Sequence, residues 1–203
     1  LGGRRIIKKK NRLVYTRMFM RSMVPKALGK LEQHPGLFDR QKLLLSQMST
    51  LGPCMAKGDL NGDGLEDIII GGAAGQSAGV YLQTKNGRFA LAANPAFDQD
   101  KACEDVDIAL LDANGDGHPD VYIASGGYHD FQPADPLLQD RLYLNDGKGT
   151  FAKNAGALPD LRGSKGCVAV ADINQDGHPD LFVGGRVAPG RYPEAPASYL
   201  LIN

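Results

Sequence analysis

The 203-residue sequence predicts an all-β protein made of three copies of one β-sheet unit. Two observations support this prediction. One is a nine-residue loop, Asp-x-Asn-x-Asp-Gly-x-x-Asp, that occurs three times, and the other is a short apolar run after each loop. The loops begin at Asp59, Asp112 and Asp172. Their intervals of about 50–60 residues fit one propeller blade of four strands with its turns, so we expect a partial β-propeller of about three four-stranded blades.

Each loop is expected to join the first and second strands of its blade. Apolar runs flank the loops, and short β-branched and aromatic runs bounded by glycine are typical of buried strands. The predicted second strands are 68–70, 121–123 and 181–183. Asn86-Gly87 and Asp146-Gly147 predict hairpins between the third and fourth strands of the first two units, because both turn positions favour positive φ. The third unit has only a matching third strand, at 198–202.

The repeats define the predicted domain organisation. We assign residues 1–37 to a basic N-terminal segment, 38–100 to a blade with the first loop, 101–160 to a blade with the second, and 161–203 to an incomplete blade with the third. The basic segment is either a remnant of a preceding blade or a non-native extension. The chain begins with Leu rather than Met and stops within a predicted strand, so we expect it to be part of a longer chain.

The loops carry the ligand types that calcium prefers. Calcium takes six to eight oxygen ligands from carboxylates, amides and backbone carbonyls. Positions 1, 3, 5 and 9 would contribute side-chain oxygens and position 7 its carbonyl, while glycine at position 6 permits the sharp turn. The predicted ligands are Asp59, Asn61, Asp63, Leu65 and Asp67; Asp112, Asn114, Asp116, His118 and Asp120; and Asp172, Asn174, Asp176, His178 and Asp180. About three bound Ca²⁺ ions follow from this pattern.

Two other interpretations of the loops are weaker. An EF-hand begins alike but requires Glu at position 12, where this sequence has Ile70, Ile123 and Val183. Plain solvated turns also favour Asp, Asn and Gly, but three loops in register, each leading into an apolar strand, favour metal binding. Sites of ordinary extracellular affinity would be nearly empty at cytosolic calcium concentrations. The predicted location is therefore extracytoplasmic: secreted, periplasmic, or attached to a cell surface or outer membrane.

The same residues resemble a known family. The loop, the strand that ends in Gly-Gly, and the outer stretch Leu-Tyr-Leu-Asn-Asp-Gly-Lys-Gly-Thr-Phe at 142–151 are similar to FG-GAP repeats, also called VCBS repeats. That family builds integrin α propellers and many bacterial secreted or outer-membrane proteins. Residues 51–59 also resemble a bacterial subgroup associated with ASPIC/UnbV domains. The resemblance covers about 38–203 and implies a calcium-bound propeller of about seven blades, of which this chain would be a fragment.

The leading functional expectation is a non-enzymatic binding or adhesion scaffold that meets a protein or glycan ligand through its loops. The alternative is the propeller portion of an extracellular polysaccharide-active enzyme whose catalytic residues lie outside this chain. A third hypothesis, nucleic-acid binding by the basic segment, lacks a recognisable motif, so no nucleic-acid partner is expected. We identify no catalytic residues and no apolar run long enough to span a membrane.

Three further features have ordinary interpretations. Cys54, Cys103 and Cys167 suit buried thiols or one bridge better than a disulfide framework. The side chains of His118 and His178 are expected to face solvent. The acidic residues of 98–107 predict an acidic surface strand, and they are Asp98, Asp100, Glu104, Asp105 and Asp107.

Overall fold

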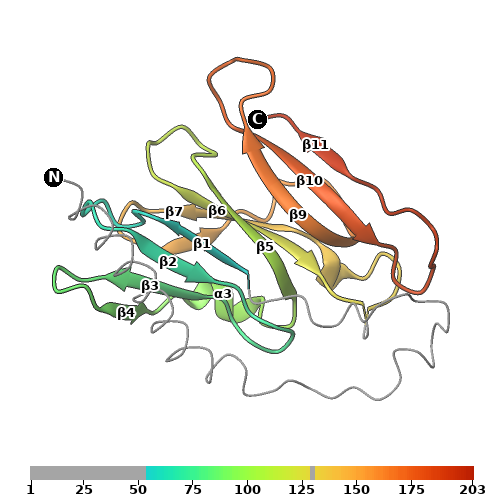
Figure 1. The fold of residues 1–203 in the computed structure, drawn as a ribbon, viewed down its shortest axis with the longest axis horizontal. Coiled ribbons are helices and arrows are strands. Elements are labelled where there is room, and N and C mark those ends of the chain that lie inside the picture. Colours follow the sequence, from blue (N-terminus) through green and yellow to red (C-terminus); the bar gives the residue numbers. More distant parts are fainter. Residues whose placement is uncertain (1–53, 129–130) are drawn as a thin grey trace, which may run out of the picture. The chain divides into compact units, whose positions relative to one another are not determined.

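The computed structural model describes residues 54–128 and 131–203, all within the compact unit Gly36–Asn203. These residues form three antiparallel sheets, with two short helical segments in the connections (Figure 1). The predicted all-β partial propeller is confirmed. The basic segment 1–37 and the start of the first blade, 38–53, lie outside the described residues.

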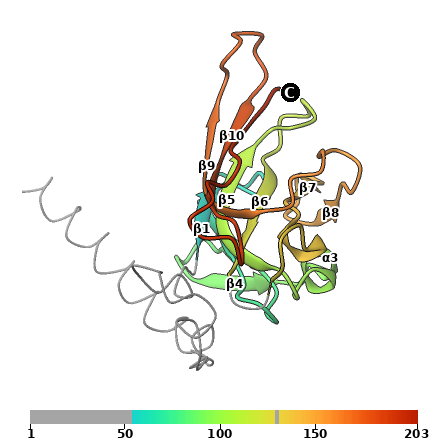
Figure 2. The ribbon, with the colours of Figure 1, turned by 90° about the vertical axis from the view of Figure 1, so that its right-hand side faces the viewer.

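Each sheet is a meander in which neighbouring strands in the sequence pair. The first contains β1 (Met55–Gly58), β2 (Asp67–Ile70), β3 (Gly79–Gln83) and β4 (Phe89–Ala92). The second contains β5 (Glu104–Leu111), β6 (Asp120–Gly126), β7 (Arg141–Asn145) and β8 (Phe151–Lys153). The third contains three strands, β9 (Ser164–Ala171), β10 (Asp180–Val187) and β11 (Tyr199–Leu201). The predicted loops join the first and second strands of all three sheets, and Figure 2 shows the β9–β10 loop extending beyond its strands.

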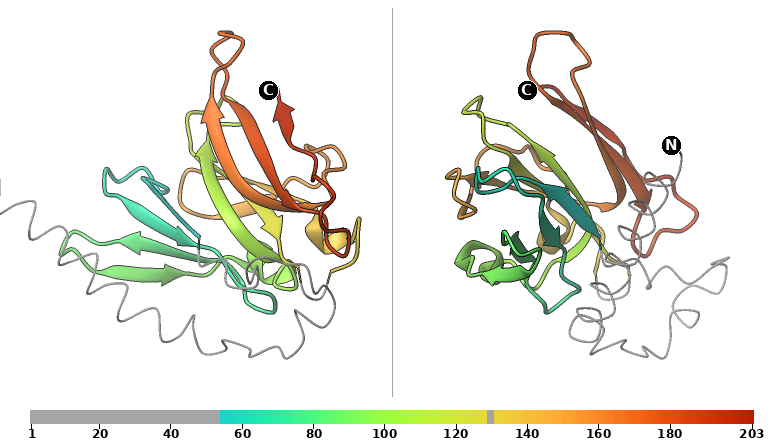
Figure 3. Two further views of the ribbon diagram at one scale, coloured as in Figure 1. Left: turned by 45° about the vertical axis from the view of Figure 1, so that its right-hand side comes forward. Right: turned by 60° about the vertical axis from the view of Figure 1, so that its left-hand side comes forward.

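The second sheet lies between the other two. Its strand β5 contacts β1 on one side and β9 on the other, as two further views show (Figure 3). One core fills the space between the first and second sheets and includes Leu60, Ile69, Val80, Val121, Ile123 and Tyr143. Another fills the space between the second and third sheets and includes Ala109, Leu111, Tyr122, Leu142, Leu181 and Val183. The second sheet is therefore buried on both faces.

A short helix that the sequence analysis did not predict completes the first core. Helix α3 (Pro95–Gln99) begins with proline at its first turn, where proline is favoured because its missing N–H would have no helical partner. Its Phe97 is buried against Tyr143 and Phe151, at ring-centroid distances of 4.5 and 5.6 Å. The 3-10 segment η1 (Pro136–Leu138) lies in the β6–β7 connection and buries Leu138.

The third sheet has one covered face and one exposed face. Leu181 is 6% exposed and packs against the second sheet, whereas the next residue, Phe182, is 43% exposed. Phe182 pairs with Leu200, which is 51% exposed, so the two side chains share one face of the sheet. This exposed face contrasts with the second sheet, where every residue of β6 is buried.

The prediction of an acidic surface strand is wrong for Asp105. Its side chain is buried and forms an ion pair with Arg141 at 2.6 Å, and its other oxygen accepts a hydrogen bond from Gly72 N–H at 2.7 Å. Asp107, in the same strand, accepts one from Val168 N–H of the third sheet at 2.8 Å. Two carboxylates of β5 therefore join the second sheet to its neighbours.

The cysteines remain free thiols. Cys103 is buried, Cys54 is half-buried and Cys167 is exposed. The expectation of buried thiols holds for Cys103 and is wrong for Cys167, and no disulfide forms among the three.

Candidate metal centres

The first acidic loop draws three predicted ligands together around its own backbone. Asp59 Oδ1 accepts the N–H groups of Gly62 and Asp63 at 2.8 and 3.2 Å, and its Oδ2 accepts that of Gly64 at 2.8 Å. Asn61 Oδ1 accepts the same Asp63 N–H at 3.0 Å. The side-chain oxygens at positions 1 and 3 thus converge on the N–H of position 5.

The other two loops repeat this arrangement. Asp116 N–H donates to Asp112 and Asn114, each at 3.1 Å, and Asp176 N–H makes the equivalent pair of bonds at 3.1 Å. The position-6 glycines have φ of 81°, 83° and 90°, a left-handed conformation that disfavours a β-carbon. Gln175 adopts a φ of 62° where the other loops have glycine. The loop geometry is therefore retained without glycine at position 4.

The residues at position 7 contribute differently from the other predicted ligands. The N–H groups of Leu65, His118 and His178 donate to the position-5 aspartates at 2.8–2.9 Å. Both histidine side chains are exposed, as expected. The backbone at position 7 is thus held close to position 5, and each residue retains a carbonyl oxygen as a possible ligand.

The ninth-position aspartates lie at the base of the loops and are fully buried. Asp67 accepts the N–H of Leu60, the second loop residue, at 2.9 Å and that of Gln83 in β3 at 2.7 Å. Asp120 and Asp180 make the same two bonds in their sheets, to the second loop residue and to a residue at the end of the third strand or two positions after it. These aspartates therefore connect loop and sheet, a structural role that the sequence analysis did not predict.

Positions 1, 3 and 5 are brought together by hydrogen bonds, whereas position 9 reaches the loop through the backbone of position 2. Over residues 54–128 and 131–203, no three His, Cys, Asp or Glu side chains form a metal cluster by themselves. A cation held in a loop would therefore also need the Asn oxygen and backbone carbonyls. This all-oxygen donor set fits calcium, because the Oδ2 of each position-1 aspartate accepts a single N–H and so retains a further lone pair.

The loop carboxylates differ in their electrostatics. Backbone N–H of His118, with the Asn114 amide, lowers the pKa of Asp116. Burial raises the pKa of Asp120, whereas the N–H groups of Asn203 and Ile173 lower the pKa of Asp180. The two ninth-position carboxylates thus have pKa values shifted in opposite directions, although both side chains are fully buried.

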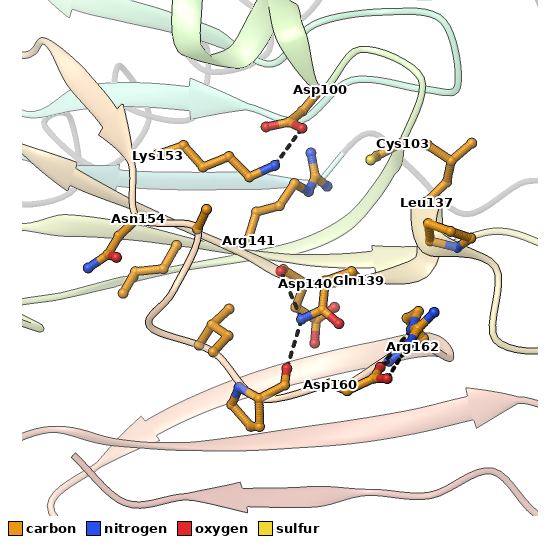
Figure 4. Close-up of a pocket in the computed structure, with 15 residues that line it drawn as sticks. Asp100, Cys103, Leu137, Gln139, Asp140, Arg141, Lys153, Asn154, Asp160 and Arg162 are labelled. Atoms are coloured by element: carbon orange, nitrogen blue, oxygen red, sulfur yellow. Dashed lines mark hydrogen bonds and ion pairs between the residues drawn. The ribbon is translucent and has the colours of Figure 1, made fainter.

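A second polar site lies at the opposite ends of the second sheet's strands. A cavity of about 460 Å³ is lined by the start of β7, the end of β8 and three connections, α3–β5, β6–β7 and β8–β9. Figure 4 shows Lys153 bonded to Asp100 on one side, at 2.7 Å, and Arg162 bonded to Asp160 on the other. Arg141 also lines it but is paired with Asp105. These charged side chains of the cavity are therefore each paired with a charge of opposite sign.

In the described part of the chain, no helix has the length and apolar character needed to cross a membrane.

Comparison with known proteins identifies the repeat. The family model of the FG-GAP-like repeat matches residues 59–123 and 112–183, and each match begins at the first residue of an acidic loop. Integrin alpha pat-2 of Caenorhabditis briggsae is 25% identical over 156 residues, and that of Caenorhabditis elegans is 26% identical over 156 residues. Each alignment covers 68% of this chain but only 13% of the integrin. The bacterial ASPIC/UnbV subgroup stays a prediction. Because the repeat model matches more than half of the chain, the chain belongs to the FG-GAP-like repeat family.

Proposed function

We propose that this chain is a calcium-stabilised β-propeller segment that serves as a binding or adhesion scaffold in a secreted or surface protein. The observation that supports it most is the threefold repetition of one loop geometry, in which the side-chain oxygens of positions 1 and 3 converge on the backbone N–H of position 5. Three loops of this kind would take about three Ca²⁺ ions.

Calcium in these loops would act on the fold. The carboxylate oxygens gathered in one loop repel one another unless a bound cation compensates their negative charge. At an affinity of about 0.1 mM and about 1 mM free calcium, each site would add roughly 1.4 kcal/mol to the free energy of unfolding. Three sites would then add about 4 kcal/mol, a large share of the roughly 5–15 kcal/mol of a typical domain.

The ends of the strands opposite the metal loops offer the surface for a partner. The β6–β7 connection, the longest in the second sheet, lines the 460 Å³ cavity there together with charged side chains of β7 and β8. Long connections on a rigid sheet are common positions for binding residues. A protein or glycan ligand is proposed for this surface, and the similarity to integrin α chains favours a protein.

The proposed location is extracytoplasmic. The affinity expected of such loops matches extracellular calcium and not the cytosolic concentration. Membership of the FG-GAP-like family supports a scaffold role for these residues. An enzymatic activity of the whole protein would require catalytic residues outside this chain.

Titration calorimetry with calcium tests this function. The wild-type chain should bind about three ions, and a variant carrying Asp59→Ala, Asp112→Ala and Asp172→Ala should bind none. Asp98→Ala is the matched control, because Asp98 is an exposed aspartate outside the loops that bonds Ser77. Unchanged calcium binding in the triple variant, or no binding by the wild type at millimolar calcium, would contradict the proposal.

A further inference from the structure

Two asparagines connect an acidic loop to the next unit: Asn145 connects the first loop to the second sheet, and Asn203 connects the second loop to the third. We propose that Asn145 and Asn203 couple the three loops, so that a cation bound in one loop raises the calcium affinity of its neighbour. The inference rests on the proposed calcium function and adds to it a mechanism of cooperation between sites.

Asn145 bridges the first and second loops. Its side-chain Nδ2 donates to the carbonyl of Leu60 in the first loop at 2.9 Å and to that of Pro119 in the second loop at 3.0 Å. Its backbone N–H donates to Asp120, the ninth residue of the second loop, at 2.8 Å. The asparagine is only 4% exposed, so water does not replace these bonds easily.

Asn203 makes two of the corresponding three bonds between the second and third loops. Its Nδ2 donates to the carbonyl of Ala113 at 3.3 Å, and its backbone N–H donates to Asp180 at 3.0 Å. Asn203 follows β11 just as Asn145 ends β7, so the two residues occupy the same place in consecutive sheets. The bridge is therefore a property of the repeat and not of one contact.

These bonds form a continuous chain through all three loops. The second residue of the first loop, Leu60, donates its N–H to its own Asp67 and accepts from Asn145 through its carbonyl. Ala113 is held in the same way, by Asp120 and Asn203. The order of the chain is Asp67, Leu60, Asn145, Asp120, Ala113, Asn203, Asp180 and Ile173.

The position of the bridged residues explains how binding would be coupled. Leu60 lies directly between Asp59 and Asn61, two predicted ligands, so fixing its peptide groups orients both. A cation in the first loop would order Leu60, and Asn145 would transmit that order to Pro119 and Asp120. The second loop then loses less conformational freedom on binding, which raises its affinity without a change of shape.

Asparagine suits this role because its amide offers two N–H donors and one acceptor. In Asn145 both donors serve the loops, and Oδ1 accepts the N–H of Gly147 in the hairpin turn at 3.1 Å. Asn86 provides a matched control, because its Oδ1 accepts the N–H of Arg88 in the equivalent hairpin of the first sheet at 3.2 Å.

A thermodynamic cycle tests the coupling. Calorimetry would measure the calcium affinity of the second loop in a protein whose third loop is disabled by Asp172→Ala, with and without Asp59→Ala in the first loop. Disabling the first loop should weaken the second about fivefold or more. In proteins that also carry Asn145→Ala the same change should be less than about twofold, whereas Asn86→Ala should leave the coupling intact.

If Asn145→Ala does not fold, Asn203→Ala provides a second test of the coupling. The Asn203 side chain is exposed, so shortening it to alanine perturbs little else. With Asp59→Ala as the background, Asp112→Ala should weaken the third loop, and Asn203→Ala should remove that effect. The inference would be overturned if the calcium affinity of the second loop were the same with and without a functional first loop. It would also be overturned if the coupling persisted in the Asn145→Ala and Asn203→Ala variants. Either result would leave the proposed function intact. No binding in any loop would overturn both.

Discussion

The second and third sheets place equivalent residues in different surroundings. Tyr122 in β6 and Phe182 in β10 each stand two residues after the ninth position of their loops, yet Tyr122 is 0% exposed and Phe182 is 43% exposed. The second sheet packs against a sheet on each face, and in the described residues the third packs on one face only. The repeat thus determines strand and loop geometry, while the neighbouring sheet determines burial.

Truncating the two aromatic residues should give the largest contrast. Tyr122→Ala should lower the free energy of unfolding by about 5 kcal/mol, because it leaves a cavity and removes the hydroxyl that donates to buried Asp140 at 2.7 Å. Phe182→Ala should cost about 1 kcal/mol or less, because its side chain is already half in water. Urea unfolding at saturating calcium measures both, and equal losses would show that the two faces are not different.

The next largest loss in the free energy of unfolding should come from breaking the buried ion pair between Arg141 and Asp105, which lies at the interface of the first and second sheets. Arg141→Ala leaves Asp105 charged and buried, and should cost about 3 kcal/mol or more. Arg162 is the control: it pairs with Asp160 at the surface near the third sheet, where solvent screens the interaction. Arg162→Ala should leave the urea midpoint unchanged. A small loss for Arg141→Ala would mean that the first interface does not depend on this pair.

Substitution of the ninth-position aspartates, Asp120 in the second loop and Asp180 in the third, should give a smaller difference in the free energy of unfolding. In Asp120→Asn an amide replaces the carboxylate that accepts the N–H groups of Ala113 and Asn145, which should cost about 1–3 kcal/mol. Asp180→Asn should cost less, because its partner Asn203 is exposed and water can take the freed N–H. Urea unfolding in excess EDTA separates this structural role from metal binding. Losses that appear only with calcium present would exclude the structural role.

Two cysteines at equivalent positions of the first and third units should differ in the rate at which their thiols are alkylated in the folded protein. Cys54 and Cys167 each stand five residues before a loop, but Cys54 Sγ donates to the Asp105 carbonyl at the first interface and Cys167 is exposed. Burial and the charges of Asp105 and Asp107 raise the pKa of Cys54 to about 12, so almost no thiolate is present at neutral pH.

Iodoacetamide at about pH 8, below the raised pKa of Cys54, should therefore label Cys167 first, as mass spectrometry of the digested protein would show. Labelling in urea is the control, because unfolding should make the cysteines equally reactive. Equal labelling rates of Cys54 and Cys167 in the folded protein would contradict the difference between the half-buried and the exposed thiol.

The sequence was sufficient for most of the fold. Alternating and β-branched runs beside Gly-rich loops predicted the strands, because strand formation and turn geometry depend on nearby residues. Helix α3 was missed because five residues give no helical periodicity, and its place depends on Phe97 packing between two sheets. Local patterns identify elements better than they identify packing partners.

The candidate site was predicted only in part for the same reason. Positions 1, 3 and 5 form local hydrogen bonds, so their spacing alone indicated that they meet. The roles of Asn145 and Asp105 depend on residues 85 and 36 positions away in the chain, and the local patterns that predict strands and turns do not report such contacts. Asn145-Asp146-Gly147 suggested only a hairpin turn, although the matching Asn203 after the third strand of the next unit was a signal that could have been noticed.

Calcium stabilisation of the fold is tested by thermal unfolding of the wild-type chain in about 1 mM calcium and in excess EDTA. Three sites worth about 4 kcal/mol together should raise the Tm by about 10 °C in calcium. The variant with Asp59→Ala, Asp112→Ala and Asp172→Ala should melt at one temperature in both solutions. A wild-type Tm that is the same with calcium as with EDTA would contradict the proposal that these loops are calcium sites that stabilise the fold.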